Sequence, residues 1–140
     1  MGPNDVEIVR VYTRQAKGDI ADCTFGTNEK CEVVVEAEAG SAIWAMGAPY
    51  WIGISIRDLT DNTVKVYSTE EGNNLGGSKW EKKTYKKVFG PFTLKDISGL
   101  TKLQGAHCFE VLAYVRAGMQ EPDVSFATSP LFMYYEPQRT

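Results

Sequence analysis

Residues 50–58 read YWIGISIRD, and this stretch decides the fold class. Its isoleucines, Ile52, Ile54 and Ile56, occupy every second position. The positions between them are Trp51, Gly53, Ser55 and Arg57. Successive side chains of a β-strand point to opposite faces, so this period of two predicts a strand with the isoleucines buried and Trp51 turned outward.

The same alternation, bounded by turn residues, recurs along the chain. It predicts strands at Val6–Thr13, Cys31–Ala39, Tyr50–Asp58, Val64–Ser68, Lys79–Phe89, Phe92–Leu94, His107–Ala117 and Ser125–Tyr135, with Asp61-Asn62 as a hairpin turn. Pro130 favours an edge or a bulge in the last strand. The loop Glu70–Ser78 is expected to be exposed, and helical patterning is limited to one turn near Leu94–Leu103.

Strands without interleaved helices predict an all-β fold. We expect one domain, residues 1–140, built as an antiparallel β-sandwich of the immunoglobulin or fibronectin type III kind. It should have seven to eight strands and at most one short helical turn. The last two strands are similar to those of fibronectin type III domains, a likeness that carries no family motif.

Cys31, Trp44 and Cys108 resemble the Cys…Trp…Cys pattern of immunoglobulin domains. The alternation argues against a disulfide between the cysteines, because Cys31 has the parity of buried residues and Cys108 shares the outward parity of Glu110. Three cysteines, an odd number, favour reduced thiols.

The net charge of −3 gives no general attraction to nucleic acids or anionic membranes. No apolar run approaches the ~20 residues that a membrane-spanning helix needs. The start of the chain lacks the basic and apolar regions of a signal peptide, so a cytoplasmic location is expected over a secreted one, unless a leader has been removed.

Two groups of residues are candidates for a ligand or partner surface. The first is the basic and aromatic segment of residues 79–87, KWEKKTYKK, with five lysines and one glutamate. Its members are Lys79, Trp80, Lys82, Lys83, Tyr85, Lys86 and Lys87. The second consists of Trp44, in the apparent loop Gly40–Pro49, and Trp51. Tryptophans on a sheet surface can stack on sugar rings or anchor a protein partner, whereas lysines on an edge strand also discourage aggregation.

Two weaker candidates involve single turns or single residues. Asp58, Asp61 and Asn62 could supply oxygen ligands to calcium, although such residues also form hairpin turns unaided. His107, the one histidine, would have to serve any Ser-His-Asp or Cys-His site. Its neighbour Cys108 points to the opposite face of the strand, and no nucleophile motif is present.

These observations favour a non-catalytic binding or assembly module with a protein or carbohydrate partner and no cofactor. Self-association into a homo-oligomer is a further option, and a specific nucleic-acid partner is not expected. The alternatives are a small barrel that carries an apolar ligand, a calcium-dependent β-sandwich that binds membranes or phosphate, and a hydrolase that uses His107.

Overall fold

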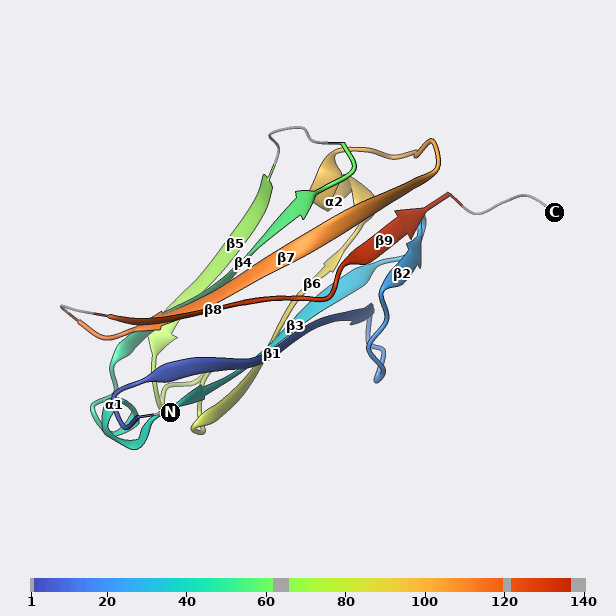
Figure 1. Cartoon of the computed structure of the whole chain (residues 1–140). Helices are drawn as coiled ribbons and strands as arrows, with labels where there is room; N and C mark the ends of the chain where they lie inside the picture. Colours follow the sequence, from blue (N-terminus) through green and yellow to red (C-terminus); the bar gives the residue numbers. More distant parts are fainter. Residues whose placement is uncertain (1, 62–65, 120–121, 137–140) are drawn as a thin grey trace.

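The computed structural model describes residues 2–61, 66–119 and 122–136. Two short helices and nine strands run through these residues (Figure 1). In chain order they are β1 (Val6–Gln15), β2 (Thr24–Gly26), β3 (Cys31–Ala39), α1 (Ser41–Ala45), β4 (Pro49–Asp58), β5 (Val66–Asn74), β6 (Thr84–Phe92), α2 (Leu94–Ser98), β7 (Ala106–Ala117), β8 (Asp123–Thr128) and β9 (Phe132–Tyr135). The all-β class is confirmed. The predicted count of seven to eight strands and one helical turn is wrong. The last predicted strand divides around Pro130, β2 lies outside the predicted strands, and a helix forms at α1. The separate strand predicted at Phe92–Leu94 is also wrong, because β6 continues to Phe92 and α2 begins at Leu94.

The first sheet has three antiparallel strands in the order β1-β3-β6. The register between β1 and β3 shifts between Ile8 and Arg10, which leaves Val9 as a bulge. Before the bulge, at the N-terminal end of β1, the edge of this strand lies against β8. There the backbone N–H groups of Val6 and Ile8 donate to the side chains of Asp123 and Ser125, at 2.8 and 3.1 Å.

The second sheet has six strands in the order β2-β9-β7-β4-β5, with β8 paired to the same side of β7 as β9. β2 runs parallel to β9, so the prediction of a purely antiparallel fold is wrong at this pair. β2 and β9 lie far apart in the sequence and are not joined by a hairpin, so their pairing is not restricted to the antiparallel direction. The sheets are not closed, so the closed barrel that an apolar-ligand carrier would need is not formed.

One apolar core draws on the inward faces of both sheets. The predicted inward residues of β4, Ile52, Ile54 and Ile56, are fully buried and lie in this core. Cys31 is buried, whereas Cys108 is partly exposed, and all three cysteines of the chain are unpaired thiols. Strand parity therefore placed both cysteines correctly.

Three local predictions need correction, each because tertiary pairing or packing overrides composition. Residues 40–49, predicted as a loop, contain α1. The predicted loop Glu70–Ser78 instead begins as strand, because β5 pairs with β4 as far as Asn74. The predicted strand Lys79–Phe89 begins only at Thr84, where pairing with β3 starts.

The two helices lie toward opposite ends of the strands (Figure 1). α2 falls within the predicted helical turn and begins with a capping box, in which Thr93 and Asp96 exchange side chain–backbone hydrogen bonds. Gly99 ends it in the left-handed conformation, with φ at 77°. Across the described residues, no helix combines the length and the apolar character that crossing a membrane requires.

Candidate functional site

The solvent-facing side of β4, β5, β7 and β8 carries an unusual set of aromatic residues, and we call it the aromatic face. In a regular sheet, directly paired residues project to the same side. The strand register therefore brings together Trp51, Arg116, Gly72 and Val124 in one row, and Gly53, Tyr114, Glu70 and Phe126 in the next. Two further rows hold Ser55, Leu112, Ser68 and Thr128, and then Arg57, Glu110 and Val66.

Trp51 lies over the backbone of the edge strand β5. A Cβ atom at Gly72, its partner on β5, would lie only 2.9 Å from Cδ1 and Nε1 of the indole. The guanidinium of Arg116, its partner on β7, sits over the same ring with its carbon 4.4 Å from the ring centroid. Glycine at position 72 thus leaves room for the indole, and Arg116 holds it by a cation–π contact.

Tyr114 crosses a whole strand. A Cβ atom at Gly53 on β4 would lie 2.6 Å from Cζ and Oη of the tyrosine, so the ring rests directly on the backbone there. The hydroxyl then reaches β5, where it donates to the carboxylate of Glu70. Both ends of the side chain are therefore held, one by the backbone of β7 and the other by Glu70 on β5.

The exposed apolar residues of this face continue the platform. Phe126, opposite Tyr114 on β8, is 65% exposed. Three more apolar side chains of this face are exposed, namely Val66, Leu112 and Val124. Solvent-facing strand positions are usually polar, so these exposed apolar side chains beside the partly buried Trp51 and Tyr114 mark an interaction surface.

A shallow hollow of about 250 Å³ lies on the same face, beyond Tyr114. Its lining residues are Ser55, Arg57, Val66, Glu110 and Leu112. Arg57 and Glu110 form an ion pair at 3.7 Å, and the hydroxyls of Ser55 and Ser68 are hydrogen-bonded at 2.9 Å. The aromatic face therefore offers flat rings at one end and paired polar groups at the other.

Of the predicted surface aromatics, only Trp51 lies on this face. Trp80 is fully buried, and its prediction as a surface residue is wrong. The physical reason is its packing: it meets the rings of Tyr50 and Tyr85 at centroid distances of 4.9 and 5.1 Å, and its indole N–H donates to the backbone of Lys83. Trp44 belongs to α1 and packs, partly buried, against the core.

Tyr85 and two of the predicted lysines converge on one buried carboxylate, that of Glu71. The Tyr85 hydroxyl donates to it at 2.9 Å, and the ammonium groups of Lys79 and Lys87 lie 2.9 and 3.6 Å away. Burial alone would raise the pKa of Glu71, but the hydrogen bonds from Lys79 and Tyr85 and the charge of Lys87 hold it below its usual value. We call this group the Glu71 cluster; it joins β5 to β6 across the open side between the two sheets.

The tyrosines around the Glu71 cluster are kept neutral. Burial, followed by the charge of Glu71, raises the pKa of Tyr50 to about 12. Burial and the bond to Glu71 raise the pKa of Tyr85 in the same direction. The Tyr50 hydroxyl is buried and has no hydrogen-bond partner in the described part of the chain. Through Glu71, the side chains of Tyr85, Lys79 and Lys87 therefore help to join β5 to β6.

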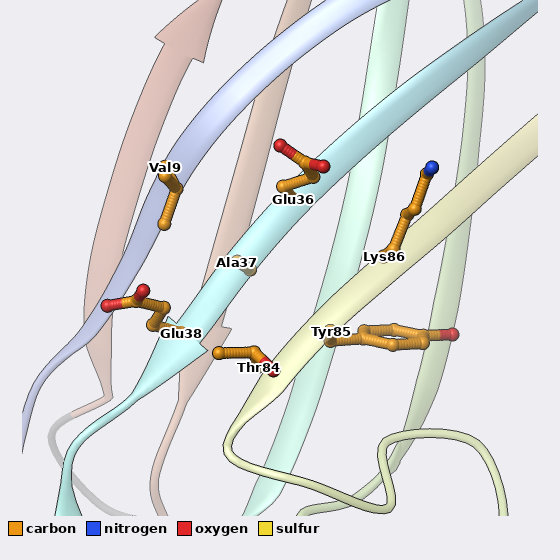
Figure 2. Close-up of a pocket in the computed structure, with 7 residues that line it drawn as sticks. All are labelled: Val9, Glu36, Ala37, Glu38, Thr84, Tyr85 and Lys86. Atoms are coloured by element: carbon orange, nitrogen blue, oxygen red, sulfur yellow. The ribbon is translucent and has the colours of Figure 1, made fainter. Parts of the chain in front are cut away.

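The remaining predicted lysines are exposed and scattered. Lys82 and Lys83 precede β6, and Lys86 lies on the outer side of the three-stranded sheet. Figure 2 shows Lys86 beside a second hollow, of about 340 Å³, with Glu36, Glu38, Thr84 and the bulged Val9. The aromatic rings of residues 79–87 turn inward, so the segment lacks the stacking surface that single-stranded nucleic acids need.

Asp58, a predicted calcium ligand, is occupied by its own turn. One carboxylate oxygen accepts the backbone N–H groups of Thr60 and Asp61, at 2.9 and 3.1 Å, and the other lies 2.7 Å from Nδ1 of His107. Asn62 lies outside the described residues. Within 2–61, 66–119 and 122–136, no three acidic, histidine or cysteine side chains gather closely enough to hold a metal ion.

The Asp58–His107 pair resembles the acid and base of a catalytic triad. Cys108, the nucleophile next to His107 in the sequence, does not complete it. His107 pairs with the buried Tyr134, so it faces the core, whereas Cys108 pairs with the exposed Met133. Imidazole and thiol therefore point to opposite sides of β7, as strand parity predicts.

Sequence reasoning missed Tyr114, Phe126 and Arg116 as parts of a site. A signal was present, because Tyr114 and Arg116 share the outward parity of Glu110, and Gly53 interrupts an otherwise bulky strand. The cross-strand partners Gly72 and Phe126 could not be found that way, since only the register supplies them.

Comparison with models of protein families gives no match, and comparison with curated protein sequences gives none either. The geometry of the chain itself therefore carries the functional argument.

Proposed function

We propose that this chain is a non-catalytic binding module, a single β-sandwich domain of the immunoglobulin or fibronectin type III kind, whose aromatic face binds a carbohydrate. The sandwich assignment is supported by the one core to which both sheets contribute. It is also supported by the connectivity, since the chain passes from one sheet to the other between β3 and β4, β5 and β6, and β6 and β7.

The observation that carries the carbohydrate proposal is the way Tyr114 rests on Gly53 of the neighbouring strand, next to the Trp51 ring on which Arg116 is stacked. A tyrosine ring fixed on a sheet offers an apolar surface on which the C–H groups of a pyranose can pack. Because the rings are fixed before the ligand arrives, little side-chain entropy is lost on binding.

The polar groups around the rings suit the same ligand. Sugars are bound through pairs of donors and acceptors to vicinal hydroxyls, and Arg57, Glu110 and Ser55 border the hollow beyond Tyr114. The absence of catalysis stays part of the proposal, and it rests on the opposite orientations of His107 and Cys108.

A protein partner, including a second copy of the chain, is the second candidate for this face. It is favoured by the exposed aliphatic side chains Leu112 and Val124 beside Phe126, because large apolar groups with tyrosine, tryptophan and arginine are typical of protein interfaces.

A glycan array followed by calorimetry of the best ligand tests the proposal, with Trp51→Ala as the site variant. The matched control is Tyr12→Ala on the three-stranded sheet, where Arg10 stacks on Tyr12 at the same 4.4 Å. We expect Trp51→Ala to weaken binding about tenfold or more and Tyr12→Ala to leave it unchanged. Two results together would favour a protein partner over a carbohydrate. The chain would bind no glycan, and it would have a dimeric mass that becomes monomeric in Phe126→Ser.

A further inference from the structure

We propose that the sugar bound at the aromatic face carries a carboxylate, as a uronic acid does, and that Arg116 receives it. This inference rests on the proposed function and deepens it by naming the ligand class. It starts from Arg116, the arginine of the face that has no carboxylate partner among the described residues.

The charged residues of the aromatic face are two arginines and two glutamates, and three of these four are already engaged. Arg57 pairs with Glu110, and Glu70 accepts the hydroxyl of Tyr114. Arg116 forms no ion pair with any carboxylate of the described residues; its contact is the Trp51 ring. Glu70 keeps its charge but is held by a neutral hydroxyl, whereas Arg116 is the arginine of the face whose guanidinium N–H groups have no carboxylate acceptor among the described residues.

The opposite sheet provides an internal comparison. Arg10 is stacked on Tyr12 at the same distance as Arg116 on Trp51, but its guanidinium also binds both carboxylate oxygens of Glu36, at 2.9 and 3.5 Å. Stacking on a ring leaves the in-plane N–H groups of a guanidinium free, and on Arg10 these are used by Glu36. On Arg116 the corresponding donors have no such acceptor among residues 2–61, 66–119 and 122–136.

A carboxylate matches those donors, because a planar guanidinium binds it through two parallel hydrogen bonds. Arg116 and Tyr114 are alternate residues of β7 on the same side, and such residues lie about 6.6 Å apart. That spacing suits a pyranose ring packed on Tyr114 whose carboxylate meets Arg116. A neutral sugar would leave the arginine without its preferred acceptor.

The test uses carboxylated oligosaccharides together with their methyl esters, which keep the sugar rings but lose the charge. The probes are an oligogalacturonate, an oligoalginate and a hyaluronan fragment, measured by calorimetry against the intact chain. We expect at least one acid to bind about ten- to a hundredfold tighter than its ester, with an affinity that falls as salt rises.

Arg116→Gln should remove that preference, so that acid and ester bind alike, and Arg10→Gln should leave it intact. Equal affinities for acid and ester in the unaltered protein overturn the inference but not the carbohydrate proposal. The inference is also overturned, and the carbohydrate proposal kept, if neutral glycans bind at Trp51 and none of the acidic ones binds. Failure of every glycan, acidic or neutral, overturns both.

Discussion

At the scale of single residues, the aromatic face depends on glycines that are needed for their missing side chain. Gly53 lies in the central strand β4, where a residue with a Cβ atom would normally pack better. Here any Cβ would meet the distal end of the Tyr114 ring, which is tied to Glu70 and cannot easily move aside. The glycine and the tyrosine therefore form one unit.

Gly53→Ala should lower the free energy of unfolding by about 1–3 kcal/mol, because it overpacks the contact with Tyr114. In a Tyr114→Ala background the same change should cost almost nothing, since the clash is gone. Urea unfolding of the four proteins in this double-mutant cycle measures the difference. An equal cost in both backgrounds would show that the ring does not rest on Gly53.

The cysteines give a second prediction at this scale. Burial raises the pKa of Cys31 to about 11, so at neutral pH its thiol is protonated as well as inaccessible. A thiol reagent should label the exposed Cys23 fastest, the partly exposed Cys108 more slowly, and Cys31 only on unfolding. Cys23→Ser should remove the fastest phase, and labelling of Cys31 in the native protein would contradict its place in the core.

At the scale of elements, the open side between β5 and β6 is joined by the Glu71 cluster. Glu71→Gln replaces a buried carboxylate that receives charged hydrogen bonds, and should cost about 1–3 kcal/mol of stability near neutral pH. The pKa of Glu71 in the folded chain lies below its ordinary value of 4.5. Its stabilisation is therefore complete above that value and is lost as the pH falls through the lowered pKa.

Chemical denaturation at about pH 6 and about pH 3 measures this dependence, and the difference between the unaltered chain and Glu71→Gln should shrink at the lower pH. Glu38→Gln on β3 is the control. Glu38 has no ion pair within the described residues, so this change should shift stability by less than about 0.5 kcal/mol at either pH. A difference that grows with acidity would contradict the cluster.

Strands β4, β5 and β6 show what the sequence could and could not predict. Parity along β4 correctly gave the buried isoleucines and the outward Trp51, because that strand alternates without a bulge. Trp80 was misplaced because it precedes β6, in a turn whose path no alternation describes. The partners of Trp51 and Tyr114 on β5 depend on the register of strands that are distant along the chain, and no single strand contains that information.

At the scale of the molecule, the two outer surfaces have different character. The outer side of the three-stranded sheet carries ion pairs such as Arg10–Glu36 and Arg14–Glu32, which neutralise one another. The aromatic face carries flat rings and an arginine without an acidic partner in the described residues. Each side has an arginine carbon 4.4 Å from an aromatic ring centroid, so one side of the molecule serves as the control for the other.

The most direct test of the aromatic face as the ligand surface is an NMR titration that follows the indole N–H signals of the three tryptophans. Trp51 lies on the aromatic face, Trp80 in the core and Trp44 on α1 against the core. With a carboxylated oligosaccharide, the account predicts that the Trp51 signal shifts with saturation while those of Trp44 and Trp80 stay in place. A saturable shift of Trp44 or Trp80 with Trp51 unmoved would contradict it, and so would three signals that no glycan moves.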